Sequence, residues 1–106
     1  MPETLKNKRP AAASSVLSIR RTFVMLNVHG LHARPAALLV KQLSRFDCEV
    51  TVECAGELAS AKSLLGLLGL AAGARSRITF TAVGVRAPQA MEAIRRLFEN
   101  RFEEAY

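Results

Sequence analysis

The spacing of apolar and polar positions predicts four strands along the chain. In residues 48–54 (CEVTVEC), Val50 and Val52 alternate with polar neighbours, which is the two-residue period of a strand with one buried face. Residues 18–26 and 77–84 contain the stretches TFVML and RITFTAVG, whose β-branched and aromatic residues favour strands. Residues 55–57 (AGE) predict a hairpin turn, so residues 58–61 should return as a short strand.

Three other stretches predict helices. From Ala33 to about Ser44 apolar residues recur at helical spacing, and Pro35 stands in the first turn, where its missing N–H leaves no bond unmade. Ser63 is suited to cap a short apolar segment, LLGLLGL, which we expect to end near Gly73. Residues 88–104 predict the last helix, whose apolar side consists of Met91, Ile94, Leu97, Phe98 and Phe102.

The predicted order of elements is β-α-β-β-α-β-α, with helices only between or after strands. This order and the tightly linked pair of strands favour an α+β fold, in which a mostly antiparallel sheet carries helices on one face. The length of 106 residues fits one domain with a modest core. We expect this domain to span residues 18–106, after a flexible basic extension at residues 1–17 that is rich in Lys, Pro, Ala and Ser.

Composition narrows the class of protein. Half of the residues are apolar and 23% are charged, as in folded globular proteins. The sequence has no apolar run of the ~18 residues that a membrane span needs and no apolar stretch typical of a secretory signal, so we expect a cytoplasmic protein without membrane insertion. Cys48 and Cys54 would lie roughly 20 Å apart in an extended strand, too far for a disulfide, and we expect both to be packing residues.

The net charge of +6 indicates an acidic partner, and one hypothesis is a small nucleic-acid-binding module. However, the 15 Lys and Arg residues are scattered along the chain. Such a module would need clustered basic residues and stacking aromatic residues on its sheet, for which Phe23, Phe46 and Phe80 are a poor supply. The charge by itself does not choose the partner.

The stretch NVHGLHARP, residues 27–35, joins the first predicted strand to the first predicted helix. His32 falls at the N-cap, where the unpaired N–H groups of the helix start, together with the guanidinium of Arg34, would bind an anion such as phosphate. The positive potential there disfavours an imidazolium, which leaves a nucleophilic ring able to take up a phosphoryl group and pass it on. A zinc site from His29 and His32 is a weaker alternative, since no Cys or carboxylate ligand lies nearby in the sequence.

Two motifs resemble the HPr family, the histidine-containing phosphocarriers of the bacterial phosphotransferase system. GLHARPA (residues 30–36) is similar to the family's active-site signature, and SAKSLLGLL (residues 60–68) is similar to its second motif, at the family's spacing. The resemblance covers residues 18–106. It implies an open-faced β-sandwich, with three helices on one face of a four-stranded antiparallel sheet.

By this resemblance we expect a phosphoryl-relay protein and not an enzyme, with no need for a metal or cofactor, and we expect a monomer. His32 would be phosphorylated on Nδ1 by phosphorylated Enzyme I and would pass the phosphoryl group to a IIA-type acceptor of sugar transport, while Arg34 would hold the phosphate. The resemblance also implies a polar residue near the site at Asn27, and no role for His29. The alternative within the family is a nitrogen-related regulatory branch, which the tail RRLFENRFEE resembles.

Ser63 matches the serine that a dedicated ATP-dependent kinase phosphorylates in some bacteria of the family, which would make an HPr serine kinase/phosphorylase a further partner. A phosphate there would hinder docking. The leucines that follow are too many for one short helix to bury, so some should form an exposed patch for partners. Basic side chains near this patch would suit acidic partner surfaces, which explains the net charge without nucleic acid. The expected docking residues are Leu64, Leu65, Leu68, Lys41 and Arg45.

Overall fold

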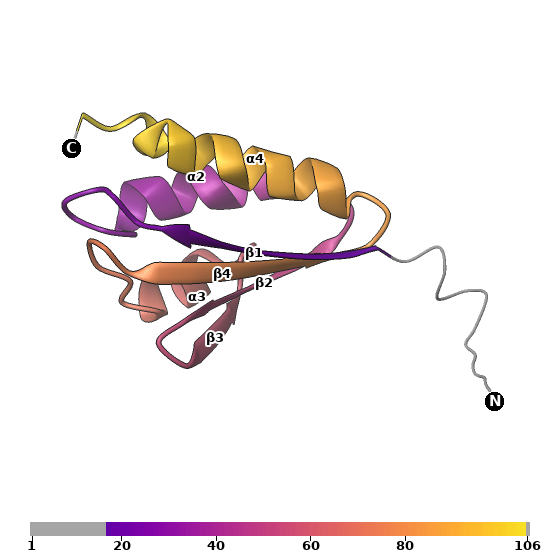
Figure 1. Ribbon diagram of the computed structural model, residues 1–106, viewed down its shortest axis with the longest axis horizontal. Coiled ribbons are helices and arrows are strands. Elements are labelled where there is room, and N and C mark those ends of the chain that lie inside the picture. Colours follow the sequence, from indigo (N-terminus) through magenta and orange to yellow (C-terminus); the bar gives the residue numbers. More distant parts are fainter. Residues whose placement is uncertain (1–16, 106) are drawn as a thin grey trace.

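The computed structural model describes residues 17–105, so the predicted extension lies outside the described residues except for its last position. The elements are β1 (Ser18–Val24), α2 (Ala33–Leu43), β2 (Glu49–Cys54), β3 (Glu57–Ser60), α3 (Leu64–Gly69), β4 (Arg77–Val83) and α4 (Ala87–Glu99), followed by a short turn, η1 (Arg101–Glu103). The four strands form one antiparallel sheet in the order β1-β4-β2-β3 (Figure 1). The three helices lie on one side of it, which confirms the α+β open-faced sandwich predicted from the sequence.

The core lies between the sheet and the two long helices, α2 and α4. Successive side chains of a strand point to opposite faces, so Val50 and Val52 of β2 are buried while their polar neighbours face outward. From the helices, Leu39 and Ile94 are fully buried against this layer. The outer face of the sheet carries polar side chains, among them Thr22 in β1 and Thr79 in β4, whose hydroxyl groups are 2.8 Å apart.

The predicted hairpin between β2 and β3 is present, but its turn has two residues and not three, because Glu57 already belongs to β3. Ala55 and Gly56 have φ angles of 51° and 86°, the left-handed values that a tight hairpin turn with the twist of its strands requires. Cys54, at the end of β2, is buried, and Cys48 packs against the core from just before the strand. Both thiols are free, which confirms that the two cysteines are packing residues and not a disulfide.

β1 and α3 end earlier than predicted. β1 ends at Val24, because the backbone of Met25 instead exchanges hydrogen bonds with the loop before β4, from Met25 N to Ser76 O (2.9 Å) and from Arg75 N to Met25 O (2.6 Å). α3 ends at Gly69 and not near Gly73, because Ala71 has a φ of 54°, which no α-helix can contain. The loop that follows α3 therefore starts early and runs beside the loop that leaves β1.

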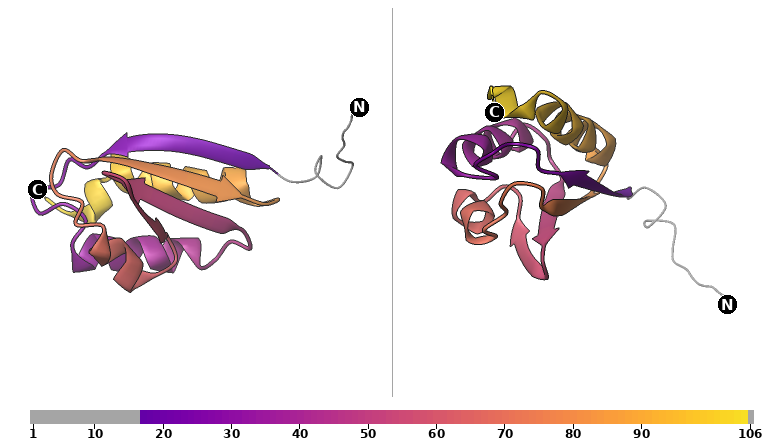
Figure 2. Two further views of the ribbon diagram at one scale, coloured as in Figure 1. Left: turned by 90° about the horizontal axis from the view of Figure 1, so that it is seen from below. Right: turned by 60° about the vertical axis from the view of Figure 1, so that its left-hand side comes forward.

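The prediction of a last helix that runs to residue 104 is wrong beyond Glu99. Three consecutive residues after it, Arg101, Phe102 and Glu103, have φ angles between 53° and 62°, so the chain makes a left-handed turn. This turn carries Phe102 into the core, where its ring lies 4.9 Å from that of Phe98 and is fully buried. The apolar spacing thus identified a buried residue correctly but not the backbone that buries it. Beyond the turn, the C-terminal segment lies at the same end of the molecule as the loop between β1 and α2 (Figures 1 and 2).

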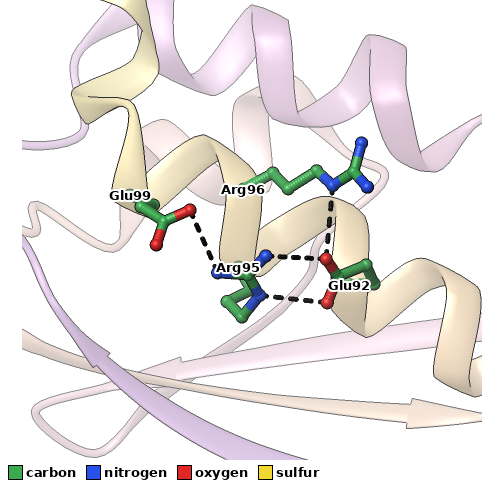
Figure 3. A network of polar contacts seen from close by, with 4 residues as sticks. All are labelled: Glu92, Arg95, Arg96 and Glu99. Carbon is green, nitrogen blue, oxygen red and sulfur yellow. Dashed lines mark hydrogen bonds and ion pairs between the residues drawn. The ribbon is translucent and has the colours of Figure 1, made fainter.

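The outer side of α4 carries a network of charges (Figure 3). Glu92 accepts hydrogen bonds from Arg95 (2.7 and 3.0 Å) and Arg96 (3.2 Å), and Arg95 also reaches Glu99 at 3.1 Å. The hydrogen bonds from Arg95, and next the one from Arg96, lower the pKa of Glu92 to about 2. These pairs are solvent-exposed, so they support the helix only modestly.

Candidate functional site

The loop between β1 and α2, residues 25–32, is held in shape by the neighbouring loop after α3. Leu31 N donates to Ala72 O at 2.8 Å, and Gly30 N donates back to Asn27 O at 3.0 Å. Gly30 has a φ of 64°, and a Cβ atom there would lie 2.3 Å from Ala72 O and 2.6 Å from Gly73 Cα. The site therefore requires glycine at this position both for the turn and for the close approach of the two loops.

His32 is the N-cap residue of α2, as predicted. Its carbonyl accepts the first helical hydrogen bond, from Ala36 N at 3.0 Å, while its side chain makes no capping bond and is 37% exposed. Pro35 has no N–H, and no hydrogen bond from the N–H groups of Ala33 and Arg34 goes to any backbone acceptor in residues 17–105. The helix start therefore presents two donors and its positive potential beside an accessible imidazole.

The guanidinium of Arg34 is also available for a ligand. Arg34 is exposed on the first turn of α2, and it forms no ion pair with the carboxylates of the described residues. No acidic residue stands in this first turn. An anion at the helix start would thus meet N–H donors and a guanidinium with no competing carboxylate on the helix.

One carboxylate does reach the ring from the C-terminal segment, and sequence reasoning missed it. Glu104 Oε2 lies 2.9 Å from His32 Nε2, and the Glu104 side chain is only 14% exposed. Asn27, a buried polar residue with 1% exposure, donates to the other carboxylate oxygen, Oε1, at 2.7 Å and to Arg101 O at 2.7 Å. Nothing in the sequence near His32 marks Glu104, because their contact depends on the left-handed turn after α4. The expected polar residue at Asn27 is present, but it faces the C-terminal segment.

The second histidine of the motif lies beside the first. The His29 and His32 rings are 5.7 Å apart between centroids and meet edge to face. Within residues 17–105 no three His, Cys, Asp or Glu side chains form a group that could hold a metal ion. The zinc hypothesis therefore finds no third ligand in the part of the chain that the structure describes.

The second motif forms α3, and Ser63 caps it as predicted: its hydroxyl accepts a hydrogen bond from Gly66 N at 3.0 Å. The leucines of this helix divide between core and solvent. Leu67 is fully buried, whereas Leu65 is 82% exposed. The three leucines predicted as docking residues, Leu64, Leu65 and Leu68, are the exposed ones.

The predicted basic docking residues lie farther along α2. Lys41 and Arg45 are exposed, and Lys41, seven residues after Arg34, lies on the same side of α2 as Arg34. Arg45, past the end of α2, lines a hollow toward α4. Lys62, next to Ser63, donates to Phe46 O at 2.6 Å and is tied to the fold. The structure thus brings His32 and Arg34 together, but Arg45 is roughly 18 Å from them along the helix axis.

The aromatic residues that a nucleic-acid module would need for stacking are not on the open face of the sheet. Phe80 is fully buried, Phe23 stacks on Phe98 with 4.8 Å between ring centroids, and Phe46 packs against the core. Stacking of bases requires exposed rings.

None of the helices within residues 17–105 has the length and apolar character needed to cross a membrane.

The chain is similar to known phosphocarriers over most of its length. A family model described as "PTS HPr component phosphorylation site" matches residues 19–100. The phosphocarrier protein HPr of Treponema pallidum (strain Nichols) is 42% identical over 84 residues, which are 79% of this chain and 96% of that protein. The multiphosphoryl transfer protein of Salmonella typhimurium is 40% identical over 87 residues, which are 79% of this chain and 23% of that larger protein.

Solved structures agree with these sequence matches. HPr-C-His from Thermoanaerobacter tengcongensis has a TM-score of 0.79 and 33% identity, and the match covers 83% of this chain and 99% of that one. The relatives favour neither alternative considered from the sequence, the nucleic-acid-binding module or the nitrogen-related branch. The chain belongs to the HPr family: it is a phosphocarrier of the phosphotransferase system, which works with other components of that system and is not a classical enzyme.

Proposed function

We propose that His32 carries a phosphoryl group from phosphorylated Enzyme I to a IIA-type acceptor of the sugar phosphotransferase system, in the cytoplasm and as a monomer. The observation that supports this most is the position of His32 as the N-cap residue of α2, with its ring exposed and Arg34 on the first turn beside it. A phosphoryl group bonded to an imidazole at this position would be stabilised by the N–H groups of the helix start. This favours a histidine nucleophile there.

The positive charge that the transferred phosphoryl group needs would come from the chain itself. The N–H groups of Ala33 and Arg34 and the Arg34 guanidinium would contact the phosphate oxygens, as donors that gain strength when the acceptor is charged. These donors belong to the first turn of α2, and the buried face of α2 packs in the core. The donors are therefore held in place and need not reorganise when the phosphate arrives.

Partners would dock on the exposed leucines of α3 and the basic side of α2. The leucines offer an apolar patch, and Lys41 and Arg45 would steer acidic partner surfaces toward it. Leu65 is 82% exposed in the isolated domain, so its side chain is not buried on folding. Burial of this side chain by a partner would therefore stabilise the complex.

Ser63 is a candidate for regulatory phosphorylation by an HPr serine kinase/phosphorylase. Its side chain is half-buried and lies directly before the docking leucines. A phosphate on Ser63 would add negative charge to a surface that we propose meets acidic partners, so it would weaken docking through repulsion.

The test is phosphorylation by cognate Enzyme I with labelled phosphoenolpyruvate. We expect an acid-labile, alkali-stable label on the wild type, loss of the label in His32→Ala, and an unchanged label in His29→Ala, the matched control from the same loop. Arg34→Ala should take up label more slowly by about tenfold or more, as expected for the loss of a charged donor to the transferred group. A wild type that takes no label, or a His32→Ala variant that keeps it, would overturn the proposal.

A further inference from the structure

We propose that Glu104 is a positioning residue for His32: its carboxylate keeps the ring proton on Nε2, so that Nδ1 is left with a lone pair for phosphoryl transfer. This inference rests on the proposed role of His32 as the phosphoryl carrier. It concerns a residue outside both sequence motifs, brought to the site from the C-terminal segment by the fold.

The geometry of the contact assigns the proton. An ionised carboxylate has only acceptor oxygens, so the 2.9 Å contact between Glu104 Oε2 and His32 Nε2 is a hydrogen bond in which Nε2–H donates. A neutral imidazole carries one N–H, and with the proton on Nε2 the other nitrogen, Nδ1, is an acceptor. Among residues 17–105 none forms a hydrogen bond to Nδ1, so this nitrogen remains available to a substrate.

Asn27 fixes the orientation of the carboxylate. Its amide nitrogen has two hydrogens, and both have acceptors: Glu104 Oε1 at 2.7 Å and Arg101 O at 2.7 Å. With Oε1 occupied by Asn27, the second oxygen, Oε2, faces the imidazole. Since Asn27 is 1% exposed and both hydrogens of its amide group are paired, it is a rigid support for Glu104. The hydrogen bonds thus link three side chains in series: buried Asn27 orients the carboxylate of Glu104, and this carboxylate orients the imidazole of His32.

The turn after α4 is what makes this contact. A continued helix would carry residue 104 away along its axis, by 1.5 Å for each residue. Instead, the left-handed residues at 101–103 fold the segment back, and Phe102 holds the turn by inserting into the core. The burial of one aromatic ring therefore positions a carboxylate two residues later.

Phosphoryl transfer balances in bonds, electrons and protons when His32 starts as a neutral ring with its proton on Nε2. The Nδ1 lone pair forms a bond to phosphorus while the bond between phosphorus and the donor's leaving atom breaks, and that electron pair stays with the donor. The phosphorylated ring keeps its proton on Nε2 and carries a positive charge, which the negative carboxylate of Glu104 offsets. Transfer to the acceptor reverses these changes, since the Nδ1–P bond breaks and its electron pair returns to Nδ1. No proton has to leave or reach His32 in either direction.

The test compares Glu104→Gln with Glu103→Gln, which removes the same charge from the neighbouring exposed residue. Imidazole ¹⁵N chemical shifts report which nitrogen carries the proton, and they need no phosphorylation. We expect the wild type and Glu103→Gln to show His32 with its proton on Nε2. In Glu104→Gln, whose amide can donate as well as accept, the shifts should move toward those of free histidine in the same buffer.

Phosphoryl transfer from Enzyme I should fall by about tenfold or more in Glu104→Gln, as for other groups that orient a reacting imidazole, and should be unchanged in Glu103→Gln. Glu104→Ala provides a second variant, and the backbone amide spectrum of each shows whether the fold is intact. Unchanged His32 shifts in both Glu104 variants, or a changed shift with unchanged transfer, would overturn the inference. If the wild type takes up no phosphate label, this contradicts the proposed function. The assignment of the ring proton to Nε2, which the ¹⁵N shifts test, would still stand.

Discussion

Gly30→Ala should destabilise the domain far more than Gly56→Ala, although both glycines have left-handed backbone. At Gly56 (φ 86°) an added Cβ meets nothing within 4 Å, so the substitution tests backbone strain alone. That strain costs about 1–2 kcal/mol for a residue with a Cβ. At Gly30 (φ 64°) the same strain applies, and the Cβ would also lie 2.3 Å from Ala72 O, a distance that atoms do not adopt.

The second effect at Gly30 is the loss of a buried hydrogen bond. To relieve the overlap, the loop that contains Ala72 must move away, and the bond from Leu31 N to Ala72 O (2.8 Å) breaks with it. Both residues are about 4% exposed, so the two groups are left without water, at a cost of about 1–3 kcal/mol. We therefore expect Gly30→Ala to lower the free energy of unfolding by about 3 kcal/mol, or Tm by roughly 15 °C for a domain of this size.

Urea unfolding followed by far-ultraviolet circular dichroism measures both variants against the wild type. The comparison uses the difference between the two variants, which removes the backbone contribution that they share. If Gly30→Ala and Gly56→Ala prove equally stable, the close packing of the two loops is not what requires glycine at position 30. The reasoning would then fail even if both variants were destabilised.

Other variants test separate parts of the structure. Phe102→Ala should lower the free energy of unfolding by about 3–5 kcal/mol in the same assay, because it empties a fully buried site; a small loss would mean that the ring does not hold the turn. Ser63→Ala should lose about 1 kcal/mol with the cap, whereas Ser63→Asp should keep the cap yet bind Enzyme I more weakly by calorimetry, and equal binding would count against Ser63 as a switch. The pKa of Glu92 is lowered from 4.5 to about 2 in the folded state, so its ion pairs contribute stability above pH 4.5 and lose it as the pH falls toward 2. The small difference in Tm between the wild type and Glu92→Gln should shrink over that range and in about 1 M salt, and an unchanged difference would contradict the assignment.

Local patterns in the sequence were sufficient for most of the fold. The alternation around Val50 and Val52 predicted β2, and the AGE stretch predicted its hairpin, because these signals depend on neighbours a few residues apart. The same holds for the position of His32 at a helix start and for the cap formed by Ser63. The surplus of leucines in α3 and its three exposed members, Leu64, Leu65 and Leu68, were also predicted from the sequence. The complete burial of Leu67 depends on what packs against the helix.

The C-terminal part of the site was decided by the tertiary structure alone. Helical spacing identified Phe102 as apolar and inward-facing, but periodicity does not reveal that residues 101–103 leave the helix through left-handed conformations. No glycine marks this turn, so the sequence carries no local signal for it, and its conformation is stabilised by Phe102 packing against Phe98. Glu104 reaches His32 across 72 positions of the chain, and such a contact exists only once the core has assembled. The sequence therefore determined which ring is presented at the helix start, whereas the packed core determined which carboxylate meets it.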